Sequence, residues 1–500
     1  MAQDISGTHL LANWQSAAHV IVRKVYIQWD GTNWVDETAR QVGTVLIRHS
    51  LLDSTLSLPL IGEAQQSTAS LVMDNGDGRF SSQVAGSMAQ TYYPNGVYRV
   101  PIRIDAGLYD ATNGAEVLRQ FTGYIEDASP VERNHANQVN LSCVDMSLEI
   151  NQDKLESTLY TNKRADEWID LITTGHYSGS TSFDMGAFTV PYCWIDKENL
   201  FRECGLVAAS EKGLVFVSKE GVLTFWRATA LVEHADSIAS QVTLTRGKCT
   251  DISGSSSWRN LYGEINVPYE PHVPGLIDTI YEAQEPIEVE PNGTAIHVAE
   301  LRWPAVSIEV PIASVDYAAV SGGTTDMNDY ITIEYAWYAQ RAQVTFTNTS
   351  SQRVYILDFQ LRGVPLIGEG SQVVSTLAES SAPLYEIAKD YTVASNPYRQ
   401  TKEQADYVAN TLRDWLQYPR RLWSYEMPLC PWIELGDRVT VQDAVHGLDE
   451  DMFVMSISES IAGTSQMMTL GLLPAANLYA YDSFLIIGTD AYASAERIYY

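Results

Sequence analysis

The chain has few positive charges for its length. Its 500 residues hold 32 Lys and Arg against 62 Asp and Glu, so the formal net charge is −30. Binding to DNA phosphates or to an anionic membrane requires clustered Lys and Arg. The composition therefore argues against a protein that wraps DNA or binds a membrane stably. It is compatible with a surface past which DNA moves without adhering, because like charges repel.

Long apolar runs and paired cysteines are also lacking. No run approaches the roughly 18–20 apolar residues that cross a bilayer, and the first residues, MAQDISGTHLLANWQ, lack the basic flank and apolar core of a signal peptide. We therefore expect a cytoplasmic product without a transmembrane segment. Five cysteines stand far apart, without CxxC or zinc spacing, which favours buried free thiols; they are Cys143, Cys193, Cys204, Cys249 and Cys430.

Catalytic motifs are missing as well. The sequence has no phosphate-binding loop, no HExxH, no GxSxG and no dinucleotide fingerprint. Asp74–Gly78 resembles a calcium loop but lacks the distal Glu, and it is more typical of a hairpin turn. The acidic runs at 282–290 and 449–451 are typical of solvated loops. We predict no catalytic residue, no cofactor, no metal ligand and no enzymatic activity.

The sequence does contain many alternating apolar and polar segments. About six such strands and no convincing helix occupy the first 150 residues. Within 121–150, Phe121, Ile125, Val139 and Leu141 are expected to point into a core. This pattern predicts a small antiparallel barrel or sandwich.

The remaining chain divides into three further parts. Residues 151–248 combine two amphipathic helices with a compact hairpin, so we expect a mixed α/β module. Residues 249–370 alternate strands with Gly and Asn turns, as in a β-sandwich. In 371–500, Thr401 and Gln404 form a capping box for the longest helix, and a second barrel with a C-terminal tail follows. The predicted fold class is mainly β with minor α: two small tube-like antiparallel β-barrels flanking a mixed α/β module and a β-sandwich.

The two ends of the chain have the same order of parts. A glycine turn at 94–96 precedes strand 97–105, then strands 121–127 and 139–144; a second glycine turn at 435–437 precedes strands 438–442, 453–460 and 467–472. Sequence identity between these segments is negligible. If the barrels are related, three chains provide six barrel positions, which could match a six-fold partner on one side and a three-fold partner on the other.

The layout resembles the central baseplate hub, or tail hub, proteins of tailed bacteriophages and gene-transfer agents. The stretches that carry the resemblance are LVMDNGDGRFSS (71–82), YYPNGVYRVPIRI (92–104), FTGYIEDASP and LSCVDMSLEI (121–150), RADEWIDLI (164–172), YILDFQLRGVPL (355–366), QADYVANTLRDWLQYPRR (404–421), IELGDRVTV, FVMSISESIAG and MMTLGLLP (433–474).

This resemblance implies a homotrimeric ring in the virion, at the phage tail tip, assembled in the host cytoplasm. Its expected partners are a distal tail or tail tube protein, a tape measure protein and a spike or central fibre protein. DNA would pass through the ring without specific binding. We expect Tyr124, Glu126 and Arg438 at the ring interface. Two alternatives stay open: a carbohydrate-binding or glycan-cleaving tail β protein that contacts the host, suggested by 28 Tyr and 12 Trp, and a distal tail protein.

Overall fold

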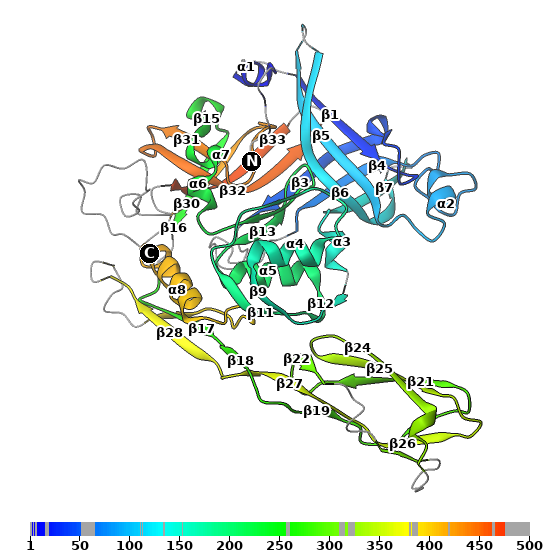
Figure 1. Ribbon diagram of the computed structural model, residues 1–500. Coiled ribbons are helices and arrows are strands. Elements are labelled where there is room, and N and C mark those ends of the chain that lie inside the picture. The colour runs from blue at the N-terminus through cyan, green and yellow to red at the C-terminus, as the bar shows by residue number, and fades with distance from the viewer. Residues whose placement is uncertain are drawn as a thin grey trace.

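The computed structural model confirms the mainly-β class (Figure 1). It describes residues 3, 5, 8–15, 20–51, 66–110, 112, 114–133, 136–152, 154–256, 261–309, 316–318, 326–379, 382, 389–418, 421–462 and 466–475. The first 150 residues contain two short helices that alternation did not reveal, α1 (Leu10–Gln15) and α2 (Met88–Tyr92).

One sheet of 13 strands joins the two ends of the chain. Its order is β16-β30-β33-β32-β3-β4-β7-β6-β5-β1-β2, and β31 pairs with β32 and β15. Its strands are β1 (Val20–Ile27), β2 (Val35–Asp36), β3 (Gln41–Ser50), β4 (Thr68–Asp74), β5 (Val100–Asp110), β6 (Gly114–Arg133), β7 (Ala136–Asp145), β15 (Ser240–Thr245), β16 (Asp251–Ser256), β30 (Arg421–Pro428), β31 (Arg438–Asp443), β32 (Leu448–Ile461) and β33 (Gln466–Pro474).

The sheet consists of two units with the same connectivity. The N-unit contains β1, β3, β4, β5, β6 and β7, and the C-unit contains β15, β16, β30, β31, β32 and β33. In the N-unit, β3 pairs with β4, β4 with β7, β7 with β6, and β6 with β5. In the C-unit, the strands at the same places in chain order pair in the same way: β16 with β30, β30 with β33, β33 with β32, and β32 with β31. The first strand lies beside the fourth in both, antiparallel in the N-unit and parallel in the C-unit. Residues 257–420 lie between β16 and β30, so they are an insertion in the C-unit alone.

The two units also share their register. The β6–β7 ladder has a bulge between Ile125 and Asp127, and the β32–β33 ladder has one between Val454 and Ser456. Adding 329 to each residue number of the first hairpin gives the matching rung of the second. Gly123↔Asp145 becomes Met452↔Pro474, and Glu132↔Asn137 becomes Ile461↔Gln466. A shared bulge within a shared register indicates duplication, because any two meanders would match in strand order alone.

The turn before each meander is equivalent too. Arg99 and Gly436 both have positive φ, 54° and 80°. The Arg99 amide donates to the Ile125 carbonyl at 2.7 Å, and the Gly436 amide donates to the Val454 carbonyl at 2.7 Å. Ile125 and Val454 are themselves equivalent in the hairpin register. The positive φ of Gly436 explains the glycine in the turn at 435–437, since the left-handed region favours glycine.

The barrels expected from the sequence differ from what is found. Closing the N-unit would require β1 to pair with β3, and the described strands contain no such ladder. The Arg23 guanidinium of β1 instead donates to the carbonyls of Gly43 and Ile461, both at 3.2 Å. The N-unit opens at β3 because the outer side of β3 is taken by the C-unit, so the two expected barrels form one continuous sheet.

A mixed α/β module lies against the sheet and has its own apolar core (Figure 1). Its hairpin β13–β14 is buried at nearly every residue. The elements are α3 (Leu148–Asn151), β8 (Lys154–Glu156), β9 (Tyr160–Arg164), α4 (Ala165–Thr173), β10 (Thr181–Phe183), β11 (Thr189–Cys193), β12 (Asp196–Asn199), α5 (Leu200–Ser210), β13 (Leu214–Val217), β14 (Leu223–Trp226), α6 (Ala230–Glu233) and α7 (Ala235–Ile238).

The insertion comprises a neck and a sandwich. In the neck, β17 (Glu264–Tyr269) pairs with β28 (Gln372–Leu377) and β29 (Asp390–Thr392), and α8 (Lys402–Leu416) packs on them. The sandwich has a separate core and extends away from the large sheet (Figure 1). Its strands are β18 (His272–Pro274), β19 (Asp278–Glu282), β20 (Ile287–Val289), β21 (Thr294–Glu300), β22 (Ala305–Ile308), β23 (Asp316–Ala318), β24 (Ile331–Trp337), β25 (Arg341–Asn348), β26 (Val354–Asp358) and β27 (Gln360–Gly368).

Candidate assembly site

The two units meet at an antiparallel seam, which we define as Val45–Ser50 of β3 paired with Ser456–Ile461 of β32. On the other side of β32, β33 runs alongside the same residues. The side of β32 that receives β3 is occupied by β31 over Leu448–Phe453, so β3 continues the edge where β31 ends. The same edge of β32 therefore pairs first with β31 of the C-unit and then with β3 of the N-unit.

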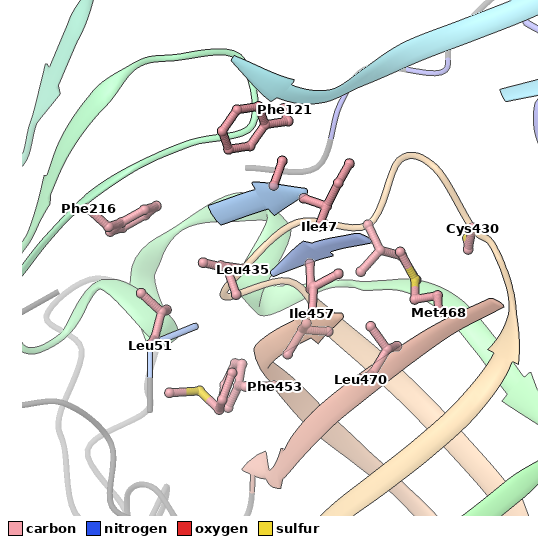
Figure 2. Close-up of a cluster of buried hydrophobic side chains, with 14 of the residues drawn as sticks. Ile47, Leu51, Phe121, Phe216, Cys430, Leu435, Phe453, Ile457, Met468 and Leu470 are labelled. Carbon is pink, nitrogen blue, oxygen red and sulfur yellow. The ribbon is translucent and has the colours of Figure 1, made fainter. Parts of the chain in front are cut away.

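Apolar side chains from both units close the seam (Figure 2). Ile47 of β3, Ile457 of β32 and Phe121 of β6 are each at most 1% exposed. Phe216 of β13 contributes to the same cluster from the α/β module. A single core therefore runs through both units. Burial of apolar surface at about 25 cal/mol per Å² makes this shared core the main force that joins them.

A buried ion pair lies beneath the seam. The Lys219 ammonium, in the β13–β14 turn, donates to Glu459 Oε1 at 2.6 Å and to Gln120 Oε1 at 2.7 Å. Glu459 lies on β32 opposite Ile47, and Gln120 lies on β6. The side chains of Lys219 and Glu459 are 3% and 0% exposed. One lysine of the module therefore contacts the N-unit and the C-unit together.

His49 completes this junction from β3. Its Nε2 lies 3.0 Å from the Gln120 carbonyl and its Nδ1 lies 2.8 Å from Ser67 Oγ. Burial, together with the nearby charge of Lys219, lowers the pKa of His49 to about 3, so the ring stays neutral. Burial also raises the pKa of Glu459, an effect that Lys219 opposes. The junction therefore holds one charge pair and a neutral imidazole.

The three residues expected at a ring interface lie in different surroundings. Tyr124 is half-buried and its hydroxyl donates to Glu149. Arg438 is half-buried and donates to Asp451 Oδ2 at 2.8 Å. Glu126 is exposed and is the bulged residue of β6. The duplication relates two of them, because Tyr124 matches Phe453, the cross-strand partner of Arg438.

Lys219, Gln120 and Glu459 were not predicted from the sequence. Lys219 lies in a hairpin turn, and it is 99 positions from Gln120 and 240 positions from Glu459, so no local pattern connects the three. The only signal is Glu459 itself, which falls on the inward side of strand 453–460, where an apolar residue is expected. An inward carboxylate implies a buried partner but does not name it.

Little in the described part of the chain suggests catalysis or metal binding. The described residues include no group of three or more His, Cys, Asp or Glu side chains placed to hold a metal ion. All five cysteines are free, four are buried and Cys249 is half-buried. No helix in the described ranges is long and apolar enough to cross a bilayer.

No protein-family model matches the chain, and no curated protein matches it. Among solved structures, the chain is similar to the 43 kDa tail protein of prophage MuSo2 from Shewanella oneidensis (13% identity, 90% of this chain and 98% of that one, TM-score 0.49). It is also similar to a tail protein from Neisseria meningitidis MC58 (9%, 92% and 98%, 0.49).

A third match is an E. coli component of the type VI secretion system, described as structurally similar to bacteriophage T4 tail proteins (8% identity, 91% of this chain and 78% of that one, TM-score 0.41). Two of these three structures are described as tail proteins, and the third as a component similar to phage tail proteins.

Proposed function

We propose that this chain is a structural hub of a phage tail tip or baseplate. Three copies form a ring that joins a six-fold tail tube or distal tail ring to a three-fold spike or central fibre. The observation that carries the proposal is the repeated register of the two units, with its bulge in the same place.

The symmetry argument follows from what is repeated and what is not. The six-stranded unit occurs twice per chain, so three chains present six similar surfaces. The sandwich is inserted in the C-unit alone, between β16 and β30, and the α/β module follows the N-unit alone. Each of these occurs three times in a trimer. A ring built this way offers six-fold contacts through the sheet units and three-fold contacts through the insertion.

The charge supports a DNA channel. With a net charge of −30 the chain repels a polyanion, so DNA passes without specific binding. The remaining partners are the tape measure protein inside the tube and a spike or fibre protein on the three-fold side. In this proposal the protein resides in the virion, is assembled in the host cytoplasm and catalyses no reaction.

A mass measurement tests the proposal. The purified chain, alone and mixed with a distal tail ring, is examined by analytical ultracentrifugation and by negative-stain microscopy with three-fold averaging. The expected particle has three times the 55.5 kDa mass of the chain. Six copies per particle would favour a distal tail protein. A chain that stays monomeric and joins no tail component would overturn the proposal.

A further inference from the structure

Two strand edges lack a partner among the described strands at the positions where the internal seam would repeat. On β32, the side that carries β31 up to Phe453 next receives β3 at Ser456–Ile461. On β6, the corresponding side pairs with β5 up to Ile125. From Asp127 to Arg133, the only described strand that pairs with β6 is β7, which lies on the opposite side. Among the described strands, none takes on β6 the position that β3 takes on β32.

The strand that matches β3 in the C-unit is β16. Ile47 of β3 lies opposite Ala69 of β4, and Gly254 of β16 lies opposite Trp423 of β30, which is the position equivalent to Ala69. Among the described strands β16 pairs with β30 alone, whereas β3 pairs with β4 on one side and with β32 on the other.

We propose that β16 of one copy of this chain pairs antiparallel with β6 of a second copy, repeating in trans the seam that β3 and β32 form in cis. This pairing rests on the proposed ring and specifies its contact. The register follows from that of the internal seam, with each β3 residue replaced by its equivalent in β16 and each β32 residue by its equivalent in β6. The expected pairs are Ile252↔Glu132, Ser253↔Val131, Gly254↔Pro130, Ser255↔Ser129 and Ser256↔Ala128.

The composition of both edges fits contact between two acidic molecules. Ile252–Ser256 contains no charged residue, and Glu132 is the one charged residue among the five β6 positions of the proposed register. Exposed edge strands usually carry charges or other features that prevent pairing with another chain. In a chain with 94 charged residues among 500, these two edges carry one charge between them, so their pairing brings no like charges together.

The faces of the two strands also agree. Ala128 lies opposite buried Leu141, so it is on the inner face, and Ser129 is on the outer face. Gly254 lies opposite buried Trp423, so it is on the inner face, and its neighbour Ser253 is on the outer face. The proposed register joins outer residues to outer residues. A shift by one residue would reverse every side chain.

The internal seam is reinforced in a way that the external one is not. Pro130 stands at the position of Glu459, so the buried pair with Lys219 has no counterpart there. A proline also removes one backbone donor from the edge. The seam between copies is therefore the weaker one, and it opens before the seam within the chain.

Cysteine cross-linking of the full chain tests the register. The double variant S129C/S255C places thiols on a predicted outer-face rung, where directly opposed Cβ atoms lie about 4.5–5.5 Å apart. Mild oxidation is expected to give covalent dimers and trimers on a non-reducing gel. The single variants S129C and S255C measure any contribution from half-buried Cys249. The matched control S129C/S253C keeps both thiols on the outer face but displaces one by two residues, and at least five-fold less product is expected.

The outcomes separate this inference from the proposed ring. A trimer by mass with no S129C/S255C product overturns the strand pairing and leaves the ring in place. Equal products from S129C/S255C and S129C/S253C overturn the register. A chain that remains monomeric at every concentration, alone and with a distal tail ring, overturns the ring and this pairing together.

Discussion

Lys219 and Glu459 are 240 positions apart in the chain, and their side chains meet at 2.6 Å in surroundings almost without solvent. This contact ties the α/β module to the seam between the two units. Removing one member of a buried pair leaves the other charged and unpaired, which costs far more than losing an exposed pair.

Lys219→Met is therefore expected to destabilise the protein by about 3–5 kcal/mol, because Glu459 stays buried without its partner. The measurement is the urea midpoint of the sheet's unfolding, followed by tryptophan fluorescence. The double variant K219M/E459L should recover most of the loss. Lys402→Met is the matched control, since Lys402 pairs with Asp406 on the surface of α8, and it should change stability by no more than about 0.5 kcal/mol. Equal effects of K219M and K402M would contradict the assignment.

Glu211 is expected to make stability depend on pH. Burial raises the pKa of its carboxyl from 4.5 to about 7, although the amides of Ala187 and Phe188 donate to it. The folded state therefore binds a proton more tightly than the unfolded state does, so this contribution is present below pH 4.5 and is lost as pH rises through 7. Glu211→Gln keeps the accepting oxygen and removes the titration.

The measurement for Glu211 is the unfolding free energy of wild type and E211Q between pH 4.5 and 8. Relative to E211Q, the wild type should lose at most about 3 kcal/mol across this window, the equivalent of the shift in pKa. Parallel pH profiles of the two proteins would refute the prediction.

Gly436 and Arg99 are equivalent, and we expect opposite responses to substitution. A Cβ on Gly436 would lie 2.2 Å from the Trp226 ring, and its φ is +80°. Gly436→Ala should therefore cost more than about 1 kcal/mol. Arg99→Gly removes a side chain from the left-handed region and should be neutral or stabilising by up to about 1 kcal/mol. Thermal unfolding measures both; a large loss in R99G would show that the two turns differ.

The sandwich is expected to be dispensable for the fold of the sheet. Pro274 and Leu366 are neighbours across the β18–β27 ladder, so Asn-Gly in place of residues 275–365 closes a two-residue hairpin. Among the described residues, the buried core of the sandwich is separate from the core of the sheet. Circular dichroism should show a retained β fold, and ultracentrifugation should show that assembly mass scales with the shortened chain. Loss of assembly would place the ring contact in the sandwich.

Local features of the fold could be predicted from the sequence. Thr401 and Gln404 form the capping box of α8, and Ala405, Val408 and Leu412 are buried, because a helix start and its apolar stripe depend on neighbours within one turn. Phe121, Ile125, Val139 and Leu141 are all buried, as alternation predicted. The order of parts in the two ends also matched.

Two features could not be predicted, each for a physical reason. The register of the repeat cannot be seen in the sequence, because equivalent positions hold side chains of different size. In the N-unit the larger side chain of the pair is Ile47, opposite Ala69, whereas in the C-unit it is Trp423, opposite Gly254. The filled space is similar and the residues are not. The seam could not be predicted because β3 would show the same alternation of apolar and polar residues in either arrangement. It could close a barrel within its own unit, or it could pair with a strand of the second unit. Which of them occurs depends on residues 400 positions away, and the ring contacts expected at Tyr124, Glu126 and Arg438 remain a prediction.

The insertion between β16 and β30 has a consequence during synthesis. Ser50 of β3 pairs with Ser456 of β32, so about 400 residues must be made before that edge of β3 meets its strand. At roughly 5–20 residues per second, translation leaves the edge open for about 20–80 s. Nascent chains on one polysome would then expose the same unpaired edge of β3 close to one another. Correct folding therefore depends on each β3 pairing with β32 of its own chain before it meets a strand of a neighbouring chain.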